Sequence, residues 1–199
     1  DGYAPPADYV DAYARQARRL GVEIVAPAPV VGLHVAGGAV RAVETAAGTI
    51  EAGAVVIAAG AHTRDVARLA GIDAPILPYR RQVFVTRPVP ALPHPIPMTV
   101  DCTTGLYAHS ESGGVLMGLS DRNEPPGFDE SVDWNFLQVV VEAATRRIPV
   151  LADAEILRGW AGLYEVTPDH HPIIGPVPGV SGLWLCAGFS GHGFMHAPA

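Results

Sequence analysis

The sequence has few of the features that mark nucleic-acid-binding, membrane-spanning or disulfide-stabilised proteins. Its net charge is −7 and its arginines cluster in pairs at most, so it lacks the basic footprint of a nonspecific nucleic-acid binder. No apolar run approaches the ~20 residues of a membrane span, and the first residues do not have the pattern of a signal peptide. Cys102 and Cys186 are too far apart in sequence for a metal or redox pair motif, which favours a reduced, cytoplasmic compartment.

What is present is a strongly apolar chain with clear local periodicity. Its 199 residues fit one large domain or two small ones, and the 49% of them that are hydrophobic allow a sizeable core. Apolar side chains three or four apart predict a helix over residues 8–20 that ends at Gly21. The sequence then favours a strand at 22–25 and a meander of strands at 30–35, 39–45 and 49–51, with a hairpin turn at Gly37-Gly38.

The next segment indicates a buried strand followed by a short helix. The run Ala54–Ala59 is almost entirely apolar and is bounded by Gly60, which predicts a strand buried on both faces. Thr63 is expected to cap a helix that reaches Ala70 and ends at Gly71.

The composition changes after residue 75. Alternating prolines between 88 and 97 exclude a helix or a central strand and predict an extended crossover. Strands are expected at 81–86, 106–109 and 115–118, a helix at 132–148, and a long strand at 154–165 that is interrupted at Gly159 and Gly162.

Four stretches resemble the D-amino-acid-oxidase superfamily of FAD-dependent oxidoreductases, in particular its glycine oxidase and sarcosine oxidase group. They are "GTIEAGAVVIAAGAHT", "LPYRRQVFVT", "GWAGLYEVTPDHHPIIG" and "GLWLCAGFSGHGFMHAPA". The branch it resembles best is the β subunit of dye-linked L-proline dehydrogenase and its sarcosine-dehydrogenase-like relatives. The resemblance implies an α/β fold, in which a partial, Rossmann-like FAD-binding domain (residues 1–78 and 159–199) accompanies a mostly antiparallel substrate domain (79–158).

The chain departs from the family pattern at its start. Family members open with a strand, a G-x-G-x-x-G turn and an acidic residue about twenty positions later, and this sequence has none of these. We therefore expect a chain truncated at both ends that lacks the main pyrophosphate site and, by itself, binds FAD weakly or not at all.

The last twelve residues carry the cofactor expectation. A strand that ends in a glycine-rich bend and enters a helix directs backbone N–H groups at one point and favours negative charge there. The resemblance implies that this bend lies against the flavin, with His192 facing the ring. The residues concerned are Gly188, Phe189, Ser190, Gly191, His192, Gly193, Phe194 and Met195. A strand–loop turn with incidental glycines is the alternative. His192 and Tyr164 are the candidate catalytic residues, although the resemblance does not imply that His192 is a base.

Two positions differ from monomeric sarcosine oxidases. Met195 stands where those enzymes have a lysine that holds the substrate carboxylate, so either another cation serves or the substrate is bound differently; a gap-filling methionine is the alternative. Gly162 stands where they have a cysteine bonded to the flavin, which implies noncovalent FAD. Tyr164 matches a tyrosine near the substrate carboxylate, though a half-buried aromatic would also explain it.

The remaining candidates are weaker. By resemblance, Val30 lies near the adenine, while Ala58, Ala59 and Gly60 lie near the ribose and pyrophosphate; a tight strand end explains the small residues equally well. Tyr107 and His109 are candidates for lining the substrate pocket. His170 and His171 have no other ligand cluster nearby in sequence, so no metal is expected.

The expected activity is oxidation of an amino acid or N-methyl amine of the proline, sarcosine or glycine type, with hydride transfer from the substrate Cα to flavin N5. The expected partners are that small substrate and either oxygen or an electron-transfer partner or subunit. The alternatives are a non-catalytic assembly factor of the same fold and a pseudo-domain that binds no FAD.

Overall fold

The computed structural model describes residues 4–93 and 95–198 and divides the chain into two compact units. Unit 1 comprises Asp1–Leu77 and Glu165–Ala199, and unit 2 comprises Pro78–Tyr164. Each unit has its own hydrophobic core. The mixture of helices with mainly antiparallel sheets agrees with the α/β class expected from the sequence.

Unit 1 contains an antiparallel meander of the three strands β1 (Val30–Ala36), β2 (Ala39–Thr45) and β3 (Gly48–Glu51). Gly37 and Gly38 join the first two strands with φ values of 59° and 72°, a pair of positive angles that a two-residue hairpin turn requires. The predicted meander is therefore confirmed, and its turn is where glycine is needed.

A second sheet of unit 1 has the order β10-β11-β4, and its strands are β4 (Val55–Ile57), β10 (Ile173–Pro176) and β11 (Leu183–Ala187). β11 runs antiparallel to β10 and parallel to β4. A core of buried side chains that includes Ile76 and Leu183 forms where this sheet meets α2 (Thr63–Arg68) and β1.

Two expectations for this region are wrong. β4 is shorter than predicted and only Ile57 is buried, because β4 is the end strand of its sheet among the described residues. Thr63 does not cap α2: it is the first residue of the helix, and its buried hydroxyl has no hydrogen-bond partner among the described residues.

The helix α1 (Pro6–Arg19) forms as predicted and ends where Gly21 adopts a φ of 86°. None of its residues is buried, so its apolar face is exposed. The strand predicted at 22–25 is absent, and these residues are irregular and exposed. A strand requires a neighbouring ladder of backbone groups, and no described strand pairs with this segment.

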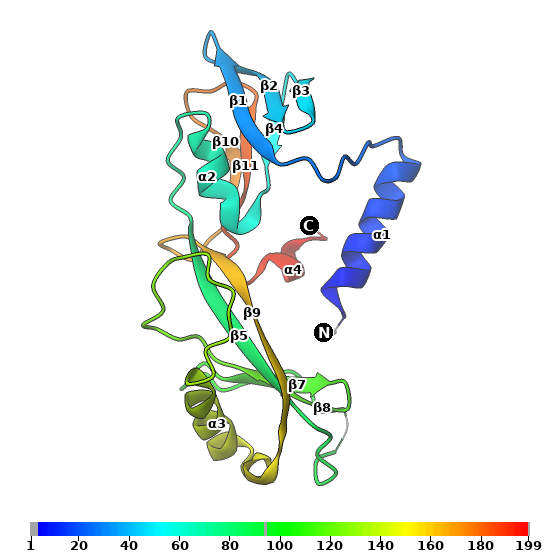
Figure 1. The fold of residues 1–199 in the computed structure, drawn as a ribbon, viewed down its shortest axis with the longest axis vertical. Coiled ribbons are helices and arrows are strands. Elements are labelled where there is room, and N and C mark those ends of the chain that lie inside the picture. Colours follow the sequence, from blue (N-terminus) through cyan, green and yellow to red (C-terminus); the bar gives the residue numbers. More distant parts are fainter. Residues whose placement is uncertain (1–3, 94, 199) are drawn as a thin grey trace. The chain divides into compact units, whose positions relative to one another are not determined.

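Unit 2 contains most of a five-stranded sheet with the order β6-β7-β8-β5-β9. Figure 1 labels the strands β5, β7, β8 and β9 of this sheet. Its strands are β5 (Leu77–Thr86), β6 (Thr99–Val100), β7 (Tyr107–Glu111), β8 (Gly114–Gly118) and β9 (Ile156–Val166). The helix α3 (Phe136–Arg147) buries Phe136 and Val140 in a core with Phe84, and a short 3₁₀ helix (Pro149–Asp153) follows it.

The predicted interruptions of β9 are wrong, since the strand continues through Gly159 and Gly162. At Gly159 the reason is packing: an added Cβ would lie 2.8 Å from Cδ1 of Phe84, so glycine lets that ring lie against the strand.

Candidate functional site

The bend after β11 has backbone angles that few residue types other than glycine adopt. Gly188, Ser190 and Gly191 have φ values of 80°, 54° and 97°, which fold the chain back before the four-residue helix α4 (Gly193–His196). A Cβ at Gly188 would lie 2.6 Å from Cγ2 of Thr167. The protein's own packing therefore requires this glycine, whether or not a ligand lies nearby.

Glu165 anchors the bend. Its carbonyl accepts a hydrogen bond from the Ser190 amide at 3.0 Å, and its carboxylate accepts one from the Phe189 amide at 3.3 Å. The other carboxylate oxygen lies 3.0 Å from the position of a Cβ on Gly60. Glu165 thus joins two segments that the sequence assigned to the cofactor, the Gly60 turn and the Gly188 bend.

These hydrogen bonds reduce the number of backbone amides in the bend that are available to bind an anion. The amides of Phe189, Ser190 and His192 already donate to protein oxygens, the last to the Phe189 carbonyl at 2.9 Å. A negatively charged group at this bend would have to use other backbone amides, of which Gly191 and Gly193 are in the predicted stretch.

Of the other cofactor candidates in unit 1, one group lies near the Gly188 bend and one residue lies in the meander. Ala58 and Ala59 lie between β4 and the 3₁₀ turn Gly60–His62, and Gly60, which follows them, lies beside the Glu165 carboxylate. Val30 begins β1 in the meander and is exposed. The structure therefore brings Gly60 to the Gly188 bend and gives Val30 no described contact with either.

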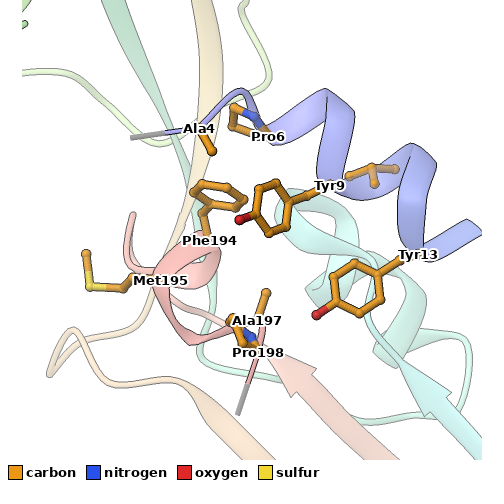
Figure 2. A pocket seen from close by; sticks show the side chains of 9 residues that line it. Ala4, Pro6, Tyr9, Tyr13, Phe194, Met195, Ala197 and Pro198 are labelled. Atoms are coloured by element: carbon orange, nitrogen blue, oxygen red, sulfur yellow. The ribbon is translucent and has the colours of Figure 1, made fainter. Parts of the chain in front are cut away.

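His192 and Met195 are both exposed. His192 is exposed, and its Nδ1 lies 3.2 Å from the Phe189 carbonyl oxygen. Met195 is 69% exposed, and Figure 2 shows its side chain at the rim of an apolar cavity of about 560 Å³ between α1 and α4. In this cavity Phe194 packs edge-on against Tyr9, with ring centroids 5.2 Å apart.

Unit 2 brings Tyr107 and Tyr164 together with an arginine that the sequence analysis had not singled out. The guanidinium of Arg81 lies 5.6 Å from the ring centroid of Tyr164 and 5.6 Å from that of Tyr79. Burial raises the pKa of the Tyr107 hydroxyl well above its usual range, the nearby Tyr164 raises it further, and Arg81 lowers it. Tyr107 is therefore a neutral hydroxyl at physiological pH.

His109 lies two residues from Tyr107 on β7, so strand alternation places both on the same face of the sheet. Its Nδ1 lies 2.9 Å from the Ser110 carbonyl oxygen. On β9, Gly162 has no heavy atom within 4 Å of the position of an added Cβ. Unlike Gly159, it is not explained by contacts within the protein, and an open glycine inside a strand suits the close approach of a flat ligand.

The described residues contain no cluster of three or more side chains suited to a metal. His170 and His171 lie in an exposed turn, where the Asp169 carboxylate accepts a hydrogen bond from the His171 amide at 3.1 Å. That bond holds the pKa of Asp169 below its usual range. The described helices also include none that is both long and apolar enough to cross a membrane.

Two residues are important to this geometry but were not predicted as site residues from the sequence. They are Glu165 and Arg81. In the sequence Arg81 follows Arg80 directly, and such pairs of arginines were considered only as a basic footprint too small for nucleic-acid binding. The available signal was strand alternation, because adjacent arginines on one strand face opposite sides and must meet different surroundings. No sequence signal identified Glu165, since its partners lie 24 or more residues away in sequence.

Comparison with known proteins relates this geometry to one family. The sequence model described as "FAD dependent oxidoreductase" matches residues 1–199. Mitochondrial dimethylglycine dehydrogenase of Rattus norvegicus is 33% identical over 216 residues, covering 99% of this chain and 25% of that protein. The sarcosine oxidase subunit beta of an Arthrobacter species is 30% identical over 190 residues, covering 94% of this chain and 45% of that protein.

Among solved structures, L-proline dehydrogenase from P. horikoshii superposes with a TM-score of 0.90 at 33% identity, over 98% of this chain and 53% of that one. The chain therefore spans about a quarter to about half of the length of these relatives.

Proposed function

The chain belongs to the family of FAD-dependent oxidoreductases, and from this premise we propose that its protein oxidises an amino acid or N-methyl amine of the proline, sarcosine or glycine type. The observation that carries the proposal is the family match along the whole chain. The names of the relatives, dimethylglycine dehydrogenase, sarcosine oxidase and L-proline dehydrogenase, support this class of substrate.

Unit 1 is the part of the protein that we assign to the FAD domain, and unit 2 is assigned to the substrate domain. The residues that would hold FAD are Val30, Ala58, Ala59, Gly60, Gly162 and the stretch Gly188–Met195. The open space at Gly162 supports this assignment, as does Glu165, which accepts hydrogen bonds from the Gly188 bend and lies beside Gly60. Because residue 162 is glycine, no side chain at this position can bond to the cofactor, and the FAD is proposed to be noncovalent here.

When bound, FAD supplies the acceptor for the hydride that leaves the substrate Cα. The task left to the protein is to hold the substrate amine and carboxylate in a reactive orientation. Tyr164, Tyr107 and His109 are proposed to line that site. His192 is proposed to lie near the ring without acting as a base, which agrees with its exposed position and its contact with a backbone carbonyl.

The electron acceptor is proposed to be oxygen or a partner subunit. Two of the relatives are themselves named as subunits, the sarcosine oxidase subunit beta and the hydrogen cyanide synthase subunit HcnC. Their names support an enzyme that is made of more than one subunit.

The test is to purify the intact protein and record its visible spectrum before and after anaerobic addition of L-proline, sarcosine or glycine. We expect flavin absorbance that is bleached by at least one of them. A yellow protein that none of these amines reduces, or a colourless one, would contradict the proposal. Acid precipitation should release the flavin into the supernatant, and flavin retained in the pellet would contradict noncovalent binding.

A further inference from the structure

We propose that Arg81 binds the carboxylate of the substrate, between the rings of Tyr79 and Tyr164. This inference rests on the proposed function and deepens it by naming the cation that Met195 cannot provide. It also restricts the substrates to amines that carry a carboxylate near the reacting carbon.

The surroundings of the Arg81 guanidinium leave hydrogen-bonding capacity unused. Its Nη1 donates to the Arg80 carbonyl at 2.7 Å, while its Nε is buried and has no hydrogen-bond partner among the described residues. A guanidinium has five N–H donors. Burying one of them without a partner costs free energy, so an acceptor from a ligand would be stabilising.

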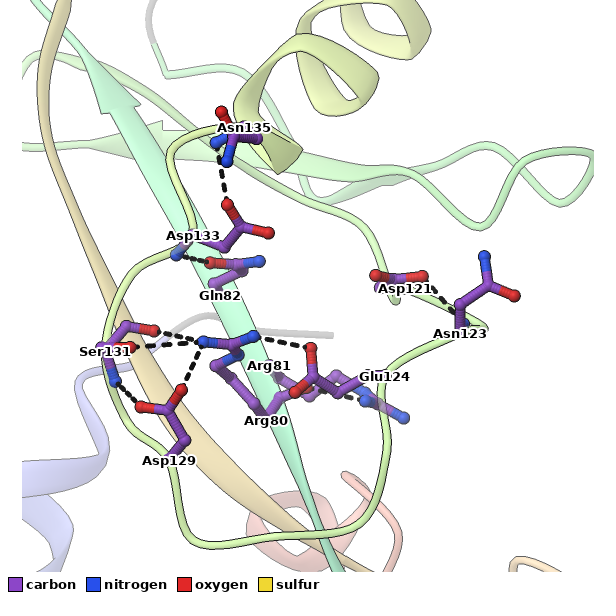
Figure 3. Close-up of polar contacts among 10 residues, drawn as sticks. All are labelled: Arg80, Arg81, Gln82, Asp121, Asn123, Glu124, Asp129, Ser131, Asp133 and Asn135. Atoms are coloured by element: carbon purple, nitrogen blue, oxygen red, sulfur yellow. Dashed lines mark hydrogen bonds and ion pairs between the residues drawn. The ribbon is translucent and has the colours of Figure 1, made fainter.

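The charge of Arg81 is also unmatched within the described part of the chain, where no carboxylate lies within 4.0 Å of it. The adjacent Arg80 differs, since it pairs with Glu124 and Asp129 at 3.0 Å each (Figure 3). Arg158 also stacks on an aromatic ring, that of Trp160 at 5.4 Å, but it has Glu111 at 3.7 Å. Arg81 is therefore a half-buried cation that has aromatic neighbours and no counter-ion.

The neighbours of Arg81 supply no negative charge of their own, so the site suits a small carboxylate that comes from a ligand. Tyr79 and Tyr164 provide flat, uncharged ring surfaces, and the protonated Tyr107 adds no negative charge. The planar fork of arginine matches the two oxygens of a carboxylate, which lysine cannot do. The chain contains thirteen basic residues, all of them arginine, so lysine is not available in this segment.

The experiment compares the wild-type holoprotein with Arg81→Gln, Arg81→Lys and the control Arg158→Gln. Binding of propionate, a carboxylate without an amine, is measured by calorimetry, with propanol as the uncharged comparison. We expect Arg81→Gln to weaken propionate binding about 10- to 100-fold, the range for hydrogen bonds to charged groups. Arg81→Lys should be intermediate because it keeps the charge and loses the fork, and Arg158→Gln should bind as the wild type does.

Steady-state kinetics test the role of Arg81 separately from the proposed amine oxidation. For Arg81→Gln we expect KM for L-proline to rise while KM for pyrrolidine, which lacks the carboxylate, stays unchanged. If both rise equally, or if the wild type does not bind propionate, Arg81 is not the carboxylate site even though amine oxidation stands. If propionate binding depends on Arg81 but no amine reduces the flavin, the proposed function fails and the carboxylate site stands.

Thermal melting identifies variants that fail to fold. If Arg81→Gln is one of them, Arg81→Lys carries the test, and unchanged propionate affinity in that variant would overturn the assignment.

Discussion

At the scale of single residues, glycine has different reasons to be present at different positions of this chain. Gly188 is buried and its missing Cβ leaves room for Thr167, whereas Gly162 leaves space that no protein atom fills. Packing within the protein thus explains the glycine at position 188, whereas the glycine at position 162 suits the approach of a ligand. A sequence motif that counts glycines cannot separate these two cases.

Gly188 and Gly179 provide a matched pair to measure this difference, because their φ values are 80° and 82°. Nothing lies within 4 Å of a Cβ at Gly179, so Gly179→Ala should reduce the free energy of unfolding by about 1 kcal/mol from backbone strain alone. Gly188→Ala should cost about 2–4 kcal/mol because it adds a clash with Thr167. Equal losses in chemical denaturation would show that the contact with Thr167 relaxes freely.

At the scale of elements, one arginine fastens a long loop to the sheet of unit 2. Arg80 on β5 contacts Glu124, Asp129 and the Ser131 carbonyl, which all lie on the connection between β8 and α3 (Figure 3). Hydrogen bonds from Ser131 and the nearby Arg80 charge hold the pKa of Asp129 below its usual range. The connection therefore has a defined path although it contains no regular structure.

Removing this anchor should destabilise the protein. The side chains of Arg80 and Glu124 are 14% and 8% exposed, so Arg80→Met leaves a buried carboxylate without its cation and should cost about 1–3 kcal/mol of unfolding free energy. The control is Arg87→Met, whose ion pair with Glu155 has the same 3.0 Å length but is 60% and 76% exposed. That change should cost less than about 1 kcal/mol, and similar losses for both in urea unfolding would argue against a structural role of the Arg80 network.

At the scale of the whole molecule, the chain buries two separate cores rather than one. Val140 is fully buried in the core of unit 2, and its neighbour Val139 on the same helix is 47% exposed. We expect Val140→Ala to cost about 1–3 kcal/mol and to reduce amide protection mainly in unit 2, because units with separate cores can open separately. Hydrogen exchange measures this, with Val139→Ala as the control; an equal loss of protection in both units would mean that they unfold as one.

Local sequence patterns were sufficient to predict several of the helices and strands and the family. Periodicity predicted α1, the meander and α3 because helix and strand patterns depend on neighbouring residues, and the motifs around Gly162 and Gly188 were sufficient for the resemblance to a flavoprotein family. The sequence could not determine whether residues 22–25 form a strand, since a strand depends on a partner ladder distant in sequence.

The tertiary structure alone decided which distant side chains meet. It joined Glu165 to the Gly188 bend, left Arg81 between two tyrosines without a counter-ion, and buried one face of β4 instead of two. These outcomes depend on strand order and on which face each strand presents, and such information is absent from any local stretch of residues.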